Sequence, residues 1–297
     1  LAAAENWIKG PPILILRIGL LYMELGDPEA ALRVIEGIPE EERDERAWFF
    51  LGAARLGQDK FEQAIQAFDR IPATSPIYGE GLIRRSQALR EAGHGDQAVS
   101  DLRKWLAEHG EDVEATLALA ALLQSLDRNK EAVELLETYR AAHEAKDARV
   151  FFALGAAYDK TGEWEKSVDN LQKAIEIDPG HAHALNYLGY TFAERGIRLE
   201  EAERFVLRAV EILPKNGYIA DSLGWVYFKQ KRLAEAKEVL ERAVKLAGDD
   251  PIIWEHLGDV CAAQGDKDRA REAYGKALSI KPDTPGLKAK LDGLGEK

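Results

Sequence analysis

Residues 254–282 read WEHLGDVCAAQGDKDRAREAYGKALSIKP, a segment whose pattern recurs along the chain. Gly258 comes directly after an apolar residue, and a second small residue, Ala270, stands twelve residues further along the chain. On either side of Gly265-Asp266, apolar and small residues are spaced three, four or seven apart, which is the period of an α-helix. Glycine before aspartate suits the end of one helix and the start of the next. The segment therefore predicts two short helices joined by a tight turn.

The same pattern occurs eight times. The first small residue recurs, at spacings of 33, 34, 34, 35, 34, 35 and 34, at Gly19, Gly52, Ser86, Ala120, Gly155, Gly189, Gly224 and Gly258. The second small residue follows at Ala31, Ala64, Ala98, Ala132, Ser167, Ala202, Ala236 and Ala270. Copies three and four diverge most, with Arg85-Ser86 and Leu119-Ala120 at the leucine-glycine step, and Trp105 and Tyr139 at the last alanine. Repeats of this length predict a solenoid in which each unit contacts its neighbours.

The pattern resembles the tetratricopeptide repeat, which runs Trp, Leu-Gly, Tyr, Ala, Phe, Ala, Pro over about 34 residues. The eighth copy matches it at Trp254, Leu257-Gly258, Cys261, Ala270, Tyr274, Ala277 and Pro282. The fifth matches it at Phe151, Leu154-Gly155, Tyr158, Ser167, Leu171, Ala174 and Pro179. The resemblance implies an all-α fold, a right-handed α-solenoid superhelix of about eight helix-turn-helix units with a concave groove and a C-terminal capping helix.

We expect one solenoid over residues 1–297, within a longer chain. Its repeats are expected at approximately 12–44, 45–78, 79–112, 113–147, 148–181, 182–216, 217–250 and 251–284, with a capping helix at 285–295. In that helix Leu287, Leu291 and Leu294 form an apolar stripe, and Lys288, Lys290 and Asp292 lie outside it. At the other end Ile13 to Leu16 leave no polar face, which predicts burial on several sides. These residues would be covered by upstream repeats, by residues 1–12 folding over them, or by a second copy of the chain.

Composition excludes several classes of partner and site. The chain has 40 lysine and arginine residues against 52 aspartate and glutamate residues, a net charge of −12, so we expect no nucleic-acid partner. The longest apolar run, Ile13 to Leu25, is interrupted by Arg17 and Glu24 and is too short for a membrane-spanning helix, so we expect no direct membrane insertion in this segment. The only cysteine, Cys261, allows neither an intrachain disulfide nor a multi-cysteine zinc site.

The sequence indicates no catalytic centre. The motifs GxGxxG, GxxxxGK[ST], GxSxG and HExxH are absent, so we expect no enzyme, no catalytic residue and no cofactor. His181 and His183, two residues apart, fall on different helix faces, and we expect the histidines to be solvated turn residues and the chain to hold no metal. Asp249-Asp250 suits a solvated helix start.

In the family that the chain resembles, the first helix of each pair lines the groove. Groove positions are apolar in the first half of the chain, as at Phe49 and Leu117, and aromatic or acidic in the second half. We expect the rings of Tyr190 and Trp225 to be exposed, although packing against the neighbouring repeat is the alternative. The predicted partner-binding groove comprises His183, Asn186, Tyr187, Tyr190, Tyr218, Asp221, Ser222, Trp225, Phe228, Glu255, His256 and Asp259.

These features predict a non-catalytic scaffold that binds a protein or peptide partner. Leu16 and Leu20 stand where the family's carboxylate clamp would need a lysine and an asparagine, so a co-chaperone function is not expected. Residues 186–190 and 221–225 look like bacterial outer-membrane lipoprotein adaptors that serve a C-terminal-processing protease in the periplasm, with a cytoplasmic location as the alternative. The alternative functions are a platform for polysaccharide export or assembly, and the repeat region of an enzyme whose catalytic domain lies outside this sequence.

Overall fold

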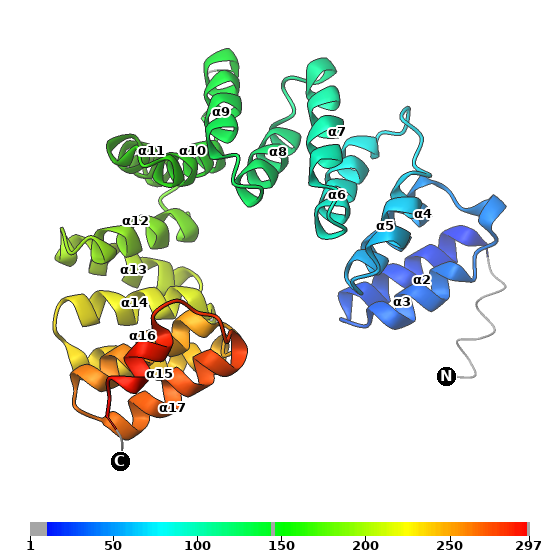
Figure 1. The fold of residues 1–297 in the computed structure, drawn as a ribbon. Helices are drawn as coiled ribbons and strands as arrows, with labels where there is room; N and C mark the ends of the chain where they lie inside the picture. Colours follow the sequence, from blue (N-terminus) through cyan, green and yellow to red (C-terminus); the bar gives the residue numbers. More distant parts are fainter. Residues whose placement is uncertain (1–10, 144–145, 296–297) are drawn as a thin grey trace. The chain divides into compact units, whose positions relative to one another are not determined.

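The computed structural model describes residues 11–143 and 146–295, and within these ranges the regular elements are all helices. The helices follow one another as helix-turn-helix pairs along the chain (Figure 1). We call the first helix of each pair the A helix; these are α2 (Pro12–Glu24), α4 (Glu45–Leu56), α6 (Tyr78–Glu91), α8 (Val113–Ser125), α10 (Ala148–Thr161), α12 (Ala182–Glu194), α14 (Gly217–Lys229) and α16 (Pro251–Ala263). The all-helical repeat fold expected from the sequence is confirmed.

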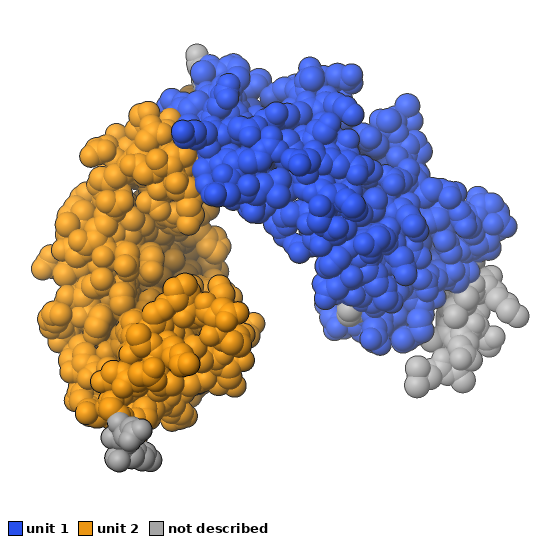
Figure 2. Space-filling model, viewed as in Figure 1, with its two compact units in different colours: residues 1–145 blue, residues 146–297 orange. Residues whose placement is uncertain are grey.

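The second helix of each pair is called the B helix. The B helices are α3 (Pro28–Glu36), α5 (Phe61–Phe68), α7 (Gly95–Glu108), α9 (Asn129–His143), α11 (Trp164–Ile177), α13 (Leu199–Ile212), α15 (Leu233–Leu246) and α17 (Lys267–Ile280). A 3-10 turn at Glu40–Glu42 precedes α4, and α18 (Leu287–Asp292) follows the last pair. The contacts divide the chain into unit 1, Leu1–Ala145, and unit 2, Lys146–Lys297 (Figure 2).

Small residues on the A helices allow the two helices of a pair to pack closely. A Cβ atom on Gly258 would lie 2.3 Å from Cε1 of Tyr274 on α17, and one on Gly224 would lie 2.5 Å from Cγ of Leu240 on α15. The large side chain of the B helix thus fills the space that glycine leaves on the A helix. This is why a small residue and a large residue recur together at each step of the repeat.

Short polar side chains begin many of the helices. Asp44, Asp112 and Asp266 accept a hydrogen bond from the backbone N–H three residues later, which satisfies a donor that the helix itself cannot. Between the helices of the fifth and eighth pairs the turn contains Gly162 and Gly265, with φ of +80° and +79°. The breakers in the sequence therefore mark helix ends, as expected.

The two ends of the described chain differ in how they are covered. At the C-terminal end the expected capping helix is present as α18, and its first residue, Leu287, is fully buried in the hydrophobic core of the last repeats. At the N-terminal end Ile15 and Leu16 are buried, but Ile13 and Leu14 are 61% and 40% exposed. The expectation that this apolar run is buried on several sides is therefore wrong for those two residues, because α2 packs through one face only.

Two further expectations concern the N-terminal segment. The proposal that residues 1–12 fold over α2 rests mainly on residues 1–10, which lie outside the described residues. Among the residues that are described, none of the helices has the length and apolar character needed to cross a bilayer.

Candidate partner-binding site

The predicted groove residues lie on three neighbouring A helices of unit 2, namely α12, α14 and α16. A cavity of about 220 Å³ opens there. The structure brings seven of the twelve predicted residues together around it, and its lining consists of Asn186, Tyr187, Tyr190, Tyr218, Asp221, Ser222, Asp250, Ile252, Ile253 and His256. The cavity is the region in which a partner side chain could be enclosed, and we call it the A-helix pocket.

Helical spacing explains why these side chains converge. Asn186 and Tyr190 are four residues apart on α12, and Tyr218 and Ser222 are four apart on α14, so each pair lies on one face of its helix. The close packing of α14 against α12 and α16 aligns these faces. The repeat period of 34 or 35 residues therefore places equivalent positions of successive A helices side by side.

A hydrogen-bonded pair of side chains, His256 and Asp221, forms the floor of the A-helix pocket. Nδ1 of His256 lies 2.9 and 3.0 Å from the two carboxylate oxygens of Asp221, and both side chains are buried. Burial of a carboxylate is unfavourable unless hydrogen bonds compensate for the lost water, which His256 provides. The expectation that the histidines are solvated turn residues is therefore wrong for His256.

Trp225 is an interior residue, which corrects the expectation that its ring is exposed. Only 8% of the residue is accessible, because its ring stacks between His256 and Phe228, at centroid distances of 4.1 and 5.0 Å. Its indole N–H donates to Oε2 of Glu194 on α12 at 2.6 Å. The ring instead packs against the neighbouring repeats, which was the alternative expectation.

The three tyrosines of the pocket lie at different depths. The Tyr187 hydroxyl donates to Asp159 at 2.9 Å, and burial together with that carboxylate raises its pKa. Tyr190 is half-buried rather than exposed; burial and the carboxylates of Glu194 and Asp221 raise its pKa to about 12. Tyr218 is 55% exposed at the rim. A ligand would therefore meet Tyr218 first and Tyr190 further inside.

Asn186 supplies an unused hydrogen-bond acceptor. Its side chain lines the A-helix pocket, and its Oδ1 atom is buried without a hydrogen-bond partner. Most buried polar atoms in proteins are paired, and an unpaired acceptor is destabilising by about 1–3 kcal/mol. Such an atom at a pocket wall would gain from a donor that a ligand brings.

Five predicted residues do not line this pocket: Trp225, His183, Phe228, Glu255 and Asp259. His183 is exposed, and Phe228 is half-buried beside Trp225. Glu255 and Asp259 share one cation, because Nζ of Lys290 on α18 lies 2.7 Å from each carboxylate, so that one of their two negative charges is offset. The sequence pattern places Lys290 outside the apolar stripe but does not reveal this pairing.

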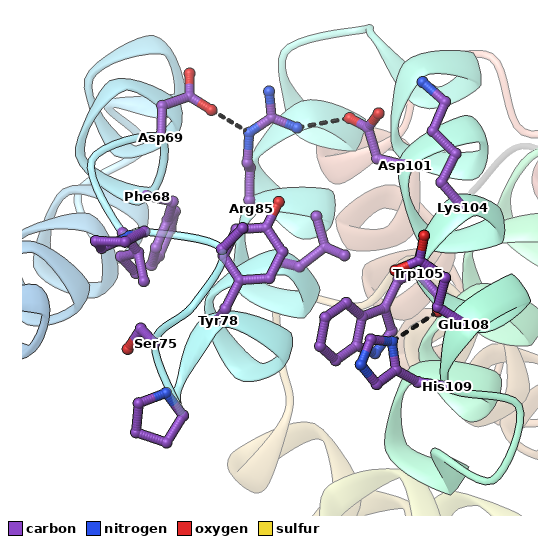
Figure 3. Close-up of a pocket in the computed structure, with 15 residues that line it drawn as sticks. Phe68, Asp69, Ser75, Tyr78, Arg85, Asp101, Lys104, Trp105, Glu108 and His109 are labelled. Atoms are coloured by element: carbon purple, nitrogen blue, oxygen red, sulfur yellow. Dashed lines mark hydrogen bonds and ion pairs between the residues drawn. The ribbon is translucent and has the colours of Figure 1, made fainter.

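A larger cavity, of about 970 Å³, lies in unit 1, where the sequence analysis predicted no site (Figure 3). Residues 69–76 lie on one side of it and α7 lies on the other. Figure 3 shows Tyr78 and Arg85 of α6 between these two sides. The guanidinium group of Arg85 bridges Asp69 and Asp101, at 2.6 and 2.7 Å. We call these three residues the Arg85 triad.

Sequence signals for this cavity were present as deviations from the repeat. Arg85 stands where six of the other copies have a buried leucine, and Trp105 stands where the last four copies have a buried alanine. The Trp105 ring stacks on His109 at 3.6 Å and donates its N–H to Asp112 at 2.8 Å. Helix α5 also has only 8 residues, against 14 in α7. The sequence shows the two substitutions, but it does not show that α5 ends early.

Comparison with known protein families identifies the repeats. Models of the tetratricopeptide repeat match residues 16–76, 148–181 and 222–285, which together make up more than half of the chain. The chain therefore belongs to the tetratricopeptide repeat family. As in that family generally, it is a helical repeat scaffold for protein interactions, and such proteins are in general non-catalytic.

Two curated relatives illustrate the range of the family. The chain is 28% identical over 190 residues to a TPR repeat-containing protein of Pseudomonas aeruginosa, a match that covers 63% of this chain and 32% of the relative. It is 28% identical over 206 residues to a peroxisomal targeting signal receptor of Candida albicans, with coverage of 66% and 35%. The match spans about a third of the length of either relative.

Solved structures resemble the fold across most of the chain. The Cut9–Hcn1 hetero-tetramer of the APC/C gives a TM-score of 0.64 at 13% identity, covering 90% of this chain and 52% of that one. A tetratricopeptide repeat protein from Parabacteroides merdae gives 0.59 at 16% identity, covering 96% and 98%. At these identities the likeness shows the fold alone.

Proposed function

We propose that the chain is a non-catalytic scaffold and that α12, α14 and α16 bind a peptide segment of a partner protein. The observation that carries this proposal is the A-helix pocket, which gathers tyrosines, acids and an unpaired amide oxygen from three repeats. Its volume of about 220 Å³ suits one large side chain rather than a whole small-molecule ligand, since ligand pockets usually measure about 300–1,000 Å³.

The rim provides apolar area for the rest of the segment. Tyr218 and Ile252 are 55% and 53% exposed and line the pocket from α14 and α16. Exposed aromatic and aliphatic residues around a pocket are typical of the few contacts that carry most of the binding energy. The similarity to proteins named as targeting-signal receptors is consistent with a peptide ligand.

The finer proposal is that the partner is a bacterial envelope protein, the chain serving as an adaptor. Its support is the resemblance of residues 186–190 and 221–225 to bacterial adaptors, and the similarity to a bacterial repeat protein. Affinity capture from a bacterial envelope extract with the wild-type chain should recover a partner that a Tyr218→Ala, Ile252→Ala double variant does not recover.

The peptide-binding proposal itself can be tested without knowing the partner. A random-peptide phage library selected on the 297-residue chain should yield peptides whose affinity falls about tenfold or more in the Tyr218→Ala, Ile252→Ala variant. Leu207→Ala is the matched control, since Leu207 is 37% exposed on α13 and does not line the pocket. Peptides that bind both variants equally well, or no selected peptide at all, would refute the proposal.

A further inference from the structure

We infer that the A-helix pocket recognises one basic side chain of the partner, an arginine or a lysine. This inference rests on the proposed function, because it names the group that enters the peptide-binding pocket. It is carried by three features of the described residues: acceptors with unused capacity, negative charge that no lysine or arginine of the lining neutralises, and aromatic walls.

The first feature is a set of acceptors with unused capacity. Oδ1 of Asn186 has no hydrogen-bond partner, and a guanidinium or ammonium group can donate to it. Asp250 uses Oδ1 to accept the backbone N–H of Ile252 at 2.8 Å, which leaves its second oxygen for a ligand. Asp221 lies on the floor, with His256 as its neighbour. Two carboxylates and one amide oxygen thus border the same small volume.

The second feature is charge that the chain does not neutralise. None of the described residues that line the pocket is a lysine or an arginine. Nearby lysines have other partners: Lys229 donates to the backbone oxygen of Glu194 at 3.3 Å, and Lys290 pairs with Glu255 and Asp259. A cation from the partner would therefore complement the pocket, whereas a carboxylate would be repelled by both aspartates.

The third feature is the aromatic wall. The side chains of Tyr187, Tyr190 and Tyr218 line the pocket, and the face of a tyrosine ring attracts a cation, more strongly when water is excluded. The aliphatic stem of arginine or lysine packs well against such rings while its head reaches polar atoms. A purely apolar side chain would fill the same space but leave the Asn186 oxygen unpaired.

The test uses the highest-affinity peptide from the phage selection, synthesised with each arginine replaced by citrulline and each lysine by norleucine. One such replacement, which removes the charge and keeps the aliphatic stem, should weaken binding about tenfold. Which residue type produces the loss tells whether the pocket takes arginine or lysine. If no single replacement weakens binding, while the Tyr218→Ala, Ile252→Ala variant still does, the inference is wrong and the proposed function stands.

Substitutions in the chain test whether the loss of affinity arises in the A-helix pocket. Asp250→Asn removes one charge yet keeps the helix start, because asparagine also caps helices, and it should weaken the peptide about fivefold. Asp249→Asn is the matched control, since Asp249 is exposed and does not line the pocket. The Asp250→Asn effect should disappear with the neutral peptide. Equal losses in both variants, or the same Asp250→Asn loss with the neutral peptide, would overturn the inference.

Discussion

The indole nitrogen of Trp225 lies 2.6 Å from Oε2 of Glu194, so that a hydrogen bond joins α14 to the last residue of α12. The same ring stacks on His256 of α16 at 4.1 Å. One side chain therefore connects three successive A helices behind the pocket. Its effect on a partner would be exerted through the alignment of these helices rather than through contact.

Trp225→Ala should lower the free energy of unfolding by about 3 kcal/mol, because it leaves a cavity among buried neighbours. Urea unfolding followed by circular dichroism measures this change. Trp254→Ala is a suitable comparison, since Trp254 is only half-buried and donates to the backbone oxygen of Gly248 at 2.8 Å. A Trp225→Ala variant with wild-type stability and lost peptide binding would show that the ring is a contact residue after all.

Two glycines of the eighth repeat should respond in opposite directions to the same substitution. Gly258→Ala should destabilise the fold by about 2 kcal/mol, because its Cβ would lie 2.3 Å from the Tyr274 ring. Gly275→Ala on α17 should stabilise it by about 1 kcal/mol, because no heavy atom beyond its own helix backbone and chain neighbours lies within 4 Å and alanine is the better helix former. Thermal melting of the two variants should bracket the wild type. If both melt at the same temperature, the close contact with Tyr274 does not govern stability.

The repeat pattern predicts the helix-turn-helix pairs, because small and apolar residues recur at fixed helical offsets. The positions of the A and B helices follow from the same regularity. The pattern does not specify where a side chain points, and the burial of Trp225 depends on His256, which is 31 residues away in the sequence. Nor does the pattern show that Glu255 and Asp259 are paired with a cation, because the position of Lys290 depends on how α18 packs.

The Tyr190 hydroxyl should lose its proton at a higher pH than a tyrosine in an unfolded chain. Because burial and two carboxylates raise its pKa to about 12, against about 10 in an unfolded chain, the folded state disfavours the phenolate. Above pH 10 the unfolded chain loses this proton first, so the contribution of Tyr190 to stability falls as the pH rises from about 10 to about 12. The difference in phenolate absorbance between wild type and Tyr190→Phe should have its midpoint near 12. In urea the midpoint should return to about 10, and a midpoint near 10 in the folded chain would contradict the burial of this hydroxyl.

The Arg85 triad makes a prediction for unit 1. Arg85→Leu restores the residue type of the other repeats, yet it should destabilise the chain by about 1–2 kcal/mol, because Asp69 and Asp101 lose the guanidinium group that bridges them. Removing the carboxylates as well, with Asp69→Ala and Asp101→Ala, should recover part of the loss. Urea unfolding of the single and triple variants measures both changes.

The control is Arg84→Leu on the same helix, since Arg84 is exposed and its hydrogen bond to Gln87 is long, at 3.4 Å. It should change the stability by less than about 0.5 kcal/mol. Because Arg85 lines the larger cavity and pairs there with Asp69, Arg85→Leu should loosen residues 69–76, which faster amide hydrogen exchange there would report. If Arg85→Leu instead raises stability, the ion pairs of Arg85 with Asp69 and Asp101 do not stabilise unit 1.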